Sequence, residues 1–156
     1  MFIILAWHPA TGKTTLAWKL KDLYPDHTII HTDDYIEHGY KESLYKMLED
    51  LESYWFKNVI VEGVMGSRLA RKMQELHSDI TIDLYIYITA NLDSILSIYQ
   101  NERPWKDMSK LKATCAGLDT VDQSIVKDTL ANISVHINGS AHDTIHKWIL
   151  WEIPKP

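Results

Sequence analysis

The sequence predicts an α/β fold, a three-layer arrangement in which helices cover both faces of an open parallel sheet. Five short apolar segments with strand character alternate along the chain with segments of helical periodicity. Strands that alternate with helices pair in parallel through right-handed crossovers. The unusual polar clusters also follow expected strands, and in such sheets ligands bind outside the carboxyl ends of the strands. We therefore expect the functional site at that edge of the sheet.

The expected strands are short, and a continuous apolar run such as residues 2–6 is typical of a strand buried on both faces. Residues 81–90 are rich in branched and aromatic side chains and form the strongest strand of the sequence. The five expected strands are 2–6, 27–31, 58–63, 81–90 and 133–139.

Between these strands, apolar residues recur at the spacing of amphipathic helices. The expected helices are 13–24, 44–55, 67–77, 91–99, 119–132 and 143–150, with Trp18, Trp55 and Trp148 in the core or against the sheet. Residues 101–118 are polar and irregular in pattern, so we expect a mobile loop or lid there.

Length and composition fit a single domain, residues 1–156, with a sizeable core. No apolar run approaches the roughly 20 residues that cross a bilayer, and the first residues lack the basic segment of a signal peptide. The single Cys115 excludes an internal disulfide and suits a reducing cytoplasm. We therefore expect a cytoplasmic protein with no membrane partner.

The charge of the chain favours a small substrate. The formal net charge is −5, and only three of the sixteen basic residues are arginines. Proteins that hold a long nucleic acid through many phosphate contacts usually show a basic face, and none is visible in the sequence. A DNA partner is thus disfavoured by the charge, although it stays open.

The stretch "WHPATGKT", Trp7 to Thr14, matches the phosphate-binding pattern G-x-x-x-x-G-K-[ST] except that Trp7 stands at the first glycine. That glycine eases the exit from the strand, and Trp7 suffices if its backbone torsions are ordinary. In such a loop the backbone N–H groups cradle phosphate oxygens, the lysine bridges the outer phosphates and the hydroxyl holds magnesium. We expect a site for ATP, or GTP, with Mg²⁺, in which Lys13 is catalytic and Thr14 is a metal ligand. The residues expected to bind this cofactor are His8, Pro9, Ala10, Thr11, Gly12, Lys13, Thr14 and Thr15.

The motif "HTDDY" places two carboxylates where the second expected strand ends. If the first strand lies near the second in the sheet, one carboxylate faces the outer phosphate of the nucleotide. There it accepts the proton of an attacking hydroxyl or helps to hold magnesium. Adjacent side chains point in different directions, so we expect Asp33 to act as base and metal ligand, and Asp34 and Tyr35 to contact the substrate.

The motif "VIVEG" ends the third expected strand with Glu62 and Gly63. We expect Glu62 to be a further magnesium ligand, directly or through water, and Gly63 to let the substrate approach the backbone.

Taken in order, the phosphate loop, "IIHTDDY", "VIVEG" and "DLYIYIT" resemble the nucleoside-kinase-like branch of the phosphate-loop kinases. Uridine kinases, nicotinamide riboside kinases and phosphoribulokinases belong to that branch. The resemblance implies a P-loop NTPase fold with a five-stranded parallel sheet and a lid after the fourth helix. It also implies that the aspartate after the second strand, Asp33 or Asp34, is the general base and substrate anchor.

In these kinases the lid brings basic residues over the phosphates. Arg103 is the one arginine of the candidate lid, and we expect it to be catalytic, although the arginine-rich lid typical of the family is absent. Arg68 and Arg71 are placed to bind an anionic group of the substrate. Asn138 and Gly139, after the fifth strand, resemble the loop that touches the adenine.

The sequence as a whole favours a kinase that moves the γ-phosphoryl group of ATP or GTP to a hydroxyl or phosphate of a small acceptor. A nucleoside, a nucleotide or a related metabolite is the favoured acceptor. One alternative is a DNA kinase acting on a hydroxymethylated base, as in the phage DNA kinases of this superfamily. Others are a nucleotide-binding protein without transfer activity and a hydrolase of nucleoside triphosphates. We expect a monomer or a homodimer.

Overall fold

Five parallel strands form one sheet in the computed structural model, which describes residues 1–8, 14–89, 93, 97, 100–101, 104 and 107–138. The strands are β1 (Phe2–Trp7), β2 (Thr28–His31), β3 (Val59–Gly63), β4 (Ile82–Thr89) and β5 (Ala131–Asn138). Their order across the sheet is β2-β3-β1-β4-β5. All four neighbouring pairs are parallel, so the five carboxyl ends lie at one edge.

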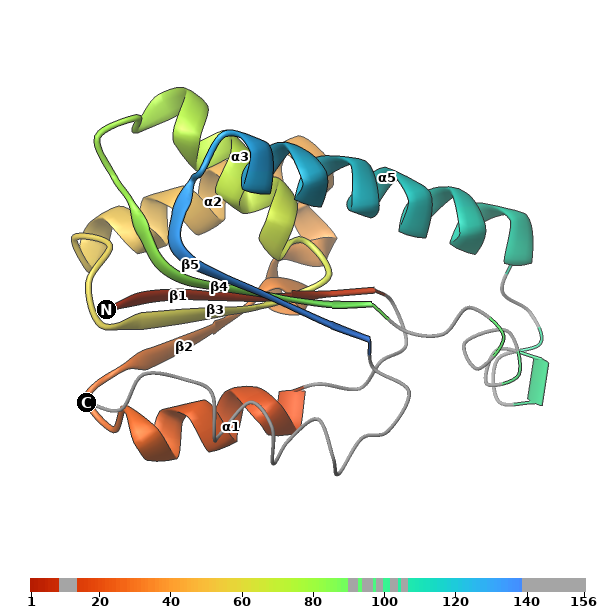
Figure 1. Ribbon diagram of the computed structural model, residues 1–156, viewed down its shortest axis with the longest axis horizontal. Helices are drawn as coiled ribbons and strands as arrows, with labels where there is room; N and C mark the ends of the chain where they lie inside the picture. The colour runs from red at the N-terminus through yellow and green to blue at the C-terminus, as the bar shows by residue number, and fades with distance from the viewer. Residues whose placement is uncertain are drawn as a thin grey trace.

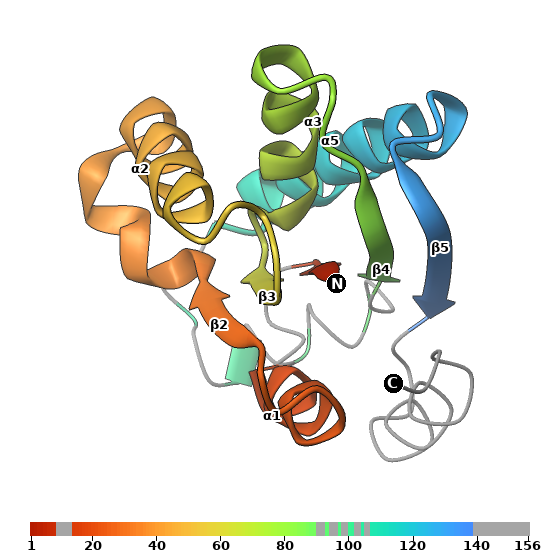
Figure 2. The ribbon, with the colours of Figure 1, turned by 90° about the vertical axis from the view of Figure 1, so that its left-hand side faces the viewer.

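Helices lie on both faces of the sheet and complete the three layers (Figure 1). The first helix, α1 (Thr14–Leu23), packs on one face. The opposite face carries α2 (Tyr40–Ser53), α3 (Gly66–Leu76) and α5 (Met108–Lys127). Figure 2 shows this division along the strands, with α1 below the sheet and the other three helices above it. A 3₁₀ helix, η1 (Thr32–His38), connects β2 to α2.

Each face of the sheet buries its own apolar core, because successive side chains of a strand point to opposite faces. The core towards α1 contains Leu5, Trp7 and Ile60 together with Leu16 and Leu20 of the helix. The core towards α2, α3 and α5 is larger, and it contains Ile4, Val61, Met47, Leu69, Met73, Tyr85, Tyr87 and Leu118 among others. β1 is buried along its whole length, as its continuous apolar sequence predicts.

The five predicted strands are confirmed, and each of their ends lies within two residues of the predicted position. The predicted irregular lid is wrong for residues 108–118, since α5 begins at Met108. Asp107 caps this helix by accepting from the backbone N–H groups of Ser109 and Lys110. Leu111, Cys115 and Leu118 then form a buried stripe at helical spacing, which holds the segment against the rest of the fold.

Two tryptophans predicted to lie in the core are exposed: Trp18 is 52% exposed and Trp55 is 80% exposed. Trp55 follows the end of α2 in a turn with positive φ, so it leaves the apolar stripe of the helix. Trp148 and the predicted helix 143–150 lie outside the described residues, as does most of the predicted helix 91–99. None of the helices in the described part of the chain is long and apolar enough to cross a bilayer.

Candidate active site

The exit from β1 is an ordinary extended strand. Trp7 pairs with Ile88 of β4 and is buried in the core towards α1. The backbone N–H of His8 donates to the carbonyl of Ile88 at 3.0 Å and extends the pairing by one residue. A strand conformation suits any side chain, so this position does not need the glycine of the phosphate-loop pattern.

The chain from Pro9 to Lys13 lies outside the described residues, and so do the side chains of Thr14 and Thr15. The backbone of Thr14 begins α1. The expected loop therefore connects the carboxyl end of a central strand to the amino end of a helix, where N–H groups without helical partners can bind phosphate.

Glu62 is the buried carboxylate of this edge, with 3% of its surface exposed. It lies in β3 beside Leu5 of β1 on one side and beside His31 of β2 on the other. Its Oε1 is hydrogen-bonded to Nδ1 of His31, and the ring of His31 lies 6.0 Å from that of Trp18 on α1. Its Oε2 has no hydrogen-bond partner among the described residues. A buried carboxylate oxygen without a donor is a position that favours a cation.

The environment of Glu62 raises the pKa of its carboxyl group above the ordinary value, chiefly because burial disfavours the charged form. The hydrogen bond and charge of His31 act in the opposite direction, whereas the negative charges of Asp33 and Asp34 raise the pKa further. A bound cation would lower the pKa and hold the carboxylate ionised.

Asp33 and Asp34 are exposed and lie in the first turn of η1. β3 lies between β2 and β1, so the condition that the second strand is next to the first is not met. Asp33 affects Glu62 more strongly than Asp34 does. Asp34 lines a hollow of about 290 Å³ along the outer edge of β2, together with Tyr35.

Tyr35 and Gly63, both predicted to contact substrate, have neighbours within the fold. The hydroxyl of Tyr35 donates to Asp50 of α2, and its ring packs against the larger core. Gly63 has a φ of 142°, and a Cβ placed there would lie 1.8 Å from Oγ1 of Thr32. The space that the missing side chain leaves is therefore filled by Thr32.

Arg68 and Arg71 both lie on α3, but their guanidinium groups have different partners. Arg71 forms an ion pair with Asp128, just beyond α5, while the guanidinium of Arg68 lies 5.4 Å from the centre of the Tyr40 ring. Arg103 and Gly139 lie outside the described residues, and Asn138 ends β5 opposite Thr89.

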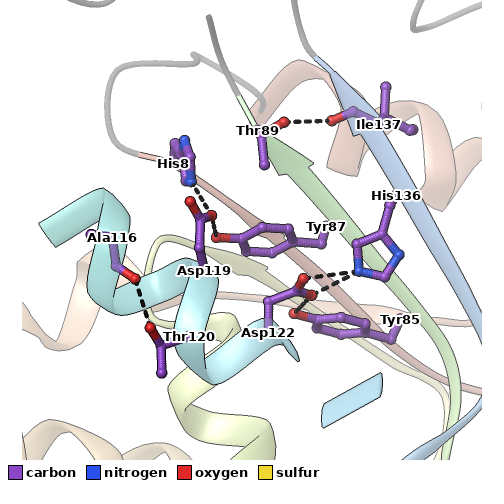
Figure 3. Close-up of polar contacts among 10 residues, drawn as sticks. All are labelled: His8, Tyr85, Tyr87, Thr89, Ala116, Asp119, Thr120, Asp122, His136 and Ile137. Carbon is purple, nitrogen blue, oxygen red and sulfur yellow. Dashed lines mark hydrogen bonds and ion pairs between the residues drawn. The ribbon is translucent and has the colours of Figure 1, made fainter. Parts of the chain in front are cut away.

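A polar network that no sequence pattern indicated joins α5 to the sheet (Figure 3). Asp119 of α5 accepts from the hydroxyl of Tyr87 at 2.8 Å and is paired with Nε2 of His8 at 2.7 Å. His8 is buried and directly precedes the rest of the expected phosphate loop. The signal that would have found the network is the recurrence of Tyr85 and Tyr87 two residues apart on a buried strand, because a buried tyrosine hydroxyl needs a partner.

A second set repeats this arrangement one turn further along α5. Asp122 accepts from the hydroxyl of Tyr85 at 2.8 Å and is paired with Nε2 of His136 of β5 at 2.9 Å (Figure 3). Burial, followed by the nearby aspartates, raises the pKa values of both tyrosines above the ordinary value, so their hydroxyls stay protonated and act as donors.

The residues at the carboxyl edge fit a magnesium ion that is shared with a nucleotide. Mg²⁺ prefers oxygen ligands and is usually held by one or two carboxylates, water and the phosphates of the substrate. Glu62 supplies a buried oxygen without a hydrogen-bond donor, and Asp33 lies within electrostatic range of it. The described residues contain no group of three ligands that would hold a metal by protein side chains alone.

The fold has a counterpart among solved structures, although neither a protein-family model nor a curated protein matches the sequence. The chain is similar to the crystal structure of shikimate kinase from Bacteroides thetaiotaomicron, with a TM-score of 0.51 and 20% sequence identity. The match covers 97% of this chain and 98% of that chain. The predicted fold class is confirmed: the chain has a five-stranded parallel α/β fold, which it shares with the shikimate kinase structure.

Proposed function

We propose that the protein is a magnesium-dependent kinase that transfers the γ-phosphoryl group of ATP or GTP to a small acceptor. The observation that carries the proposal is Glu62, a buried carboxylate with one oxygen lacking a donor, in the strand next to the one that leads into Gly12-Lys13-Thr14. In the folds of phosphate-loop kinases, these two strand ends face the same nucleotide. The fold shared with shikimate kinase supports phosphoryl transfer as the general chemistry.

In this proposal the loop from His8 to Thr15 binds the nucleotide, and Lys13 contacts its outer phosphates. Glu62, Asp33 and Thr14 would hold the magnesium ion, which supplies positive charge where negative charge develops during transfer. Asp33 accepts the proton of the acceptor hydroxyl; in support of this choice over Asp34, the charge of Asp33 acts more strongly on Glu62. Arg103 would add positive charge from the segment that follows β4.

The acceptor that we propose is a nucleoside, a nucleotide or a related metabolite, in line with the net charge of −5. We place the protein in the cytoplasm, where reducing conditions suit its one cysteine, which is buried. Tyr35 holds η1 to α2 through Asp50, and Arg71 is paired with Asp128, so neither is assigned a step in the reaction.

The test is turnover of ATP with magnesium against a panel of nucleosides, nucleotides, shikimate and hydroxymethylated DNA. We expect transfer to one acceptor, and a loss of at least about a hundredfold in Lys13→Met and Asp33→Asn. Asp34→Asn is the matched comparison for Asp33→Asn, and we expect it to keep most of the activity. Nucleotide binding without transfer to any acceptor would refute the proposal in favour of a binding protein. Phosphate release that needs no acceptor would indicate a hydrolase.

A further inference from the structure

The helices α2 and α3 both lie on the face of the sheet opposite α1 (Figure 2). Side chains of both helices line a groove on that face. Its volume is about 310 Å³, which is at the lower end of the range for small-ligand sites. The lining residues come from α2, from one stripe of α3 and from α5: Tyr40, Lys41, Leu44, Tyr45, Arg68, Arg71, Lys72, Glu75 and Val121.

The walls of this groove, here called the α2–α3 groove, are positively charged although the protein is acidic. Four cationic side chains line it, against the single carboxylate of Glu75. Lys72 is paired with Glu75 at 3.2 Å, and Arg71 is paired with Asp128. In the described part of the chain, no carboxylate lies within ion-pair distance of Lys41 or Arg68. Among the described residues, two positive charges of the groove are thus left without a counter-charge.

Arg68 lies against an aromatic ring of α2. Its guanidinium lies 5.4 Å from the centre of the Tyr40 ring, and it also approaches Gly117 of α5. Stacking on an aromatic ring uses the face of the guanidinium and leaves the N–H groups at its edge available to an anion. An arginine that already packs against a ring loses less conformational freedom when it binds an anion, which favours binding of a phosphate group.

The remaining wall of the groove is apolar and aromatic. Leu44 and Val121 contribute aliphatic surface, and the ring of Tyr45 lies beneath the ammonium group of Lys72 at 5.5 Å. Tyr40 and Tyr45 are about half exposed, so a ligand can reach their rings from solvent. A ligand that combines one anionic group with a small organic body would contact both kinds of surface.

We propose that the α2–α3 groove binds a small organic phosphate monoester, with its phosphate at Arg68 and Lys41 and its organic body against Leu44, Val121 and the tyrosine rings. The groove is separate from the phosphate loop, because the helix that follows that loop, α1, lies on the other face of the sheet. Bound phosphate would bridge α2 and α3 through one residue of each helix.

The experiment is a titration of the full chain with phenyl phosphate, followed by calorimetry and by amide chemical shifts. We expect saturable one-to-one binding, with the largest shifts in α2 and α3. Arg68→Gln and Lys41→Gln should each weaken binding by about tenfold, because each removes a charge-assisted contact to the phosphate. Arg68→Lys, which keeps the charge but loses the planar fork, should recover only part of the affinity.

Lys46→Gln is the matched control, because Lys46 is an exposed lysine of the same helix that does not line the groove. It should bind phenyl phosphate like the unchanged protein. Absence of saturable binding, or equal weakening by Lys46→Gln and Lys41→Gln, would overturn the inference. So would binding that survives in Arg68→Gln but is lost in Lys13→Met, because phosphate would then occupy the loop before α1. If instead the groove variants lose binding and no acceptor is ever phosphorylated, the inference stands and the proposed kinase activity fails.

Discussion

At the scale of single residues, Glu62 shows a conflict between stability and binding. Burial raises the pKa of its carboxyl group, so the folded protein holds this proton to a higher pH than the unfolded chain does. The folded state then binds more protons in that range, and stability falls as pH rises through the raised pKa. Above the raised pKa the ionised Glu62 therefore weakens the fold unless a cation is bound.

We expect Glu62→Gln to keep or raise the free energy of unfolding above neutral pH, while magnesium-dependent turnover falls by at least about a hundredfold. The amide has nearly the same size and its oxygen can still accept a hydrogen bond from His31, but it carries no charge. Urea unfolding over a range of pH, together with turnover at saturating nucleotide, measures both effects. The advantage of the variant should shrink as pH falls towards the ordinary pKa of glutamate.

Glu52→Gln is the comparison for this prediction, because Glu52 also pairs with a histidine, His77 at 2.7 Å, but is half exposed. It should leave magnesium-dependent turnover unchanged. A Glu62→Gln protein that is less stable than the unchanged one at every pH would contradict the assignment of Glu62 as a destabilising, cation-binding carboxylate.

Gly63→Ala should destabilise the protein by about 2–4 kcal/mol, since the new Cβ would collide with Thr32 in a backbone conformation that already disfavours side chains. Gly39→Ala separates these two causes. Gly39 also has positive φ, at 78°, but a Cβ at this position would have nothing within 4 Å, so we expect only the strain, about 1–2 kcal/mol. Urea unfolding of both variants gives the comparison.

Adding Thr32→Ala to Gly63→Ala tests the same contact from the other side. It removes the Oγ1 that a Cβ at Gly63 would meet, so part of the lost stability should return. Thr32→Ala alone should cost little, because this buried hydroxyl has no hydrogen-bond partner among the described residues. Purely additive losses in the double variant would show that the two residues do not interact as described.

At the scale of elements, two carboxylates connect α5 to the sheet, and each of them has the same kinds of partner. Asp119 and Asp122 each bind one tyrosine of β4 and one histidine, which lies just after β1 or within β5 (Figure 3). The two aspartates differ in the position of the histidine that each one binds. Asp119 holds His8, at the start of the expected phosphate loop, whereas Asp122 holds His136 within β5.

We expect Asp119→Asn to weaken binding of the magnesium–ATP complex by about tenfold, or ~1.4 kcal/mol, because it loosens the residue from which the loop begins. Asp122→Asn should cost more stability, since its side chain is only 10% exposed against 43% for Asp119, yet it should leave nucleotide affinity unchanged. Nucleotide titration and urea unfolding of both variants separate the two roles. Equal weakening of nucleotide binding in both variants would mean that α5 acts through general stability alone.

At the scale of the whole molecule, the order of the strands decides which side chains meet. β3 lies between β2 and β1, so Glu62 is nearer than Asp33 to the strand that leads into the phosphate loop. Asp33 follows the edge strand β2, and its negative charge raises the pKa of Glu62. The role expected of Asp33 was conditional on the second strand lying near the first. The crossover from β1 to β2 skips one position, so the acidic residue beside β1 is Glu62.

Local pattern determined much of the fold. The apolar runs predicted all five strands, and the helical stripe of Leu44, Met47, Leu48 and Leu51 is buried in α2 as its spacing predicts. The start of α5 was missed because it was taken together with the polar run that precedes it, residues 101–107, although Asp107 is a good helix cap. The exposure of Trp55 was missed because the end of α2 depends on a turn and not on periodicity.

The sequence by itself determined that acidic residues follow the strands next to a Gly-Lys-Thr motif, and therefore where a site should lie. Only the tertiary structure decided which side chains contact these acidic residues. The register of β2 against β3 places His31 beside Glu62, and the packing of α5 brings Asp119 to His8 across 111 positions of the chain. The physical reason is that helical and strand periodicity reflect which face of an element is buried, whereas strand order and register depend on contacts between distant segments.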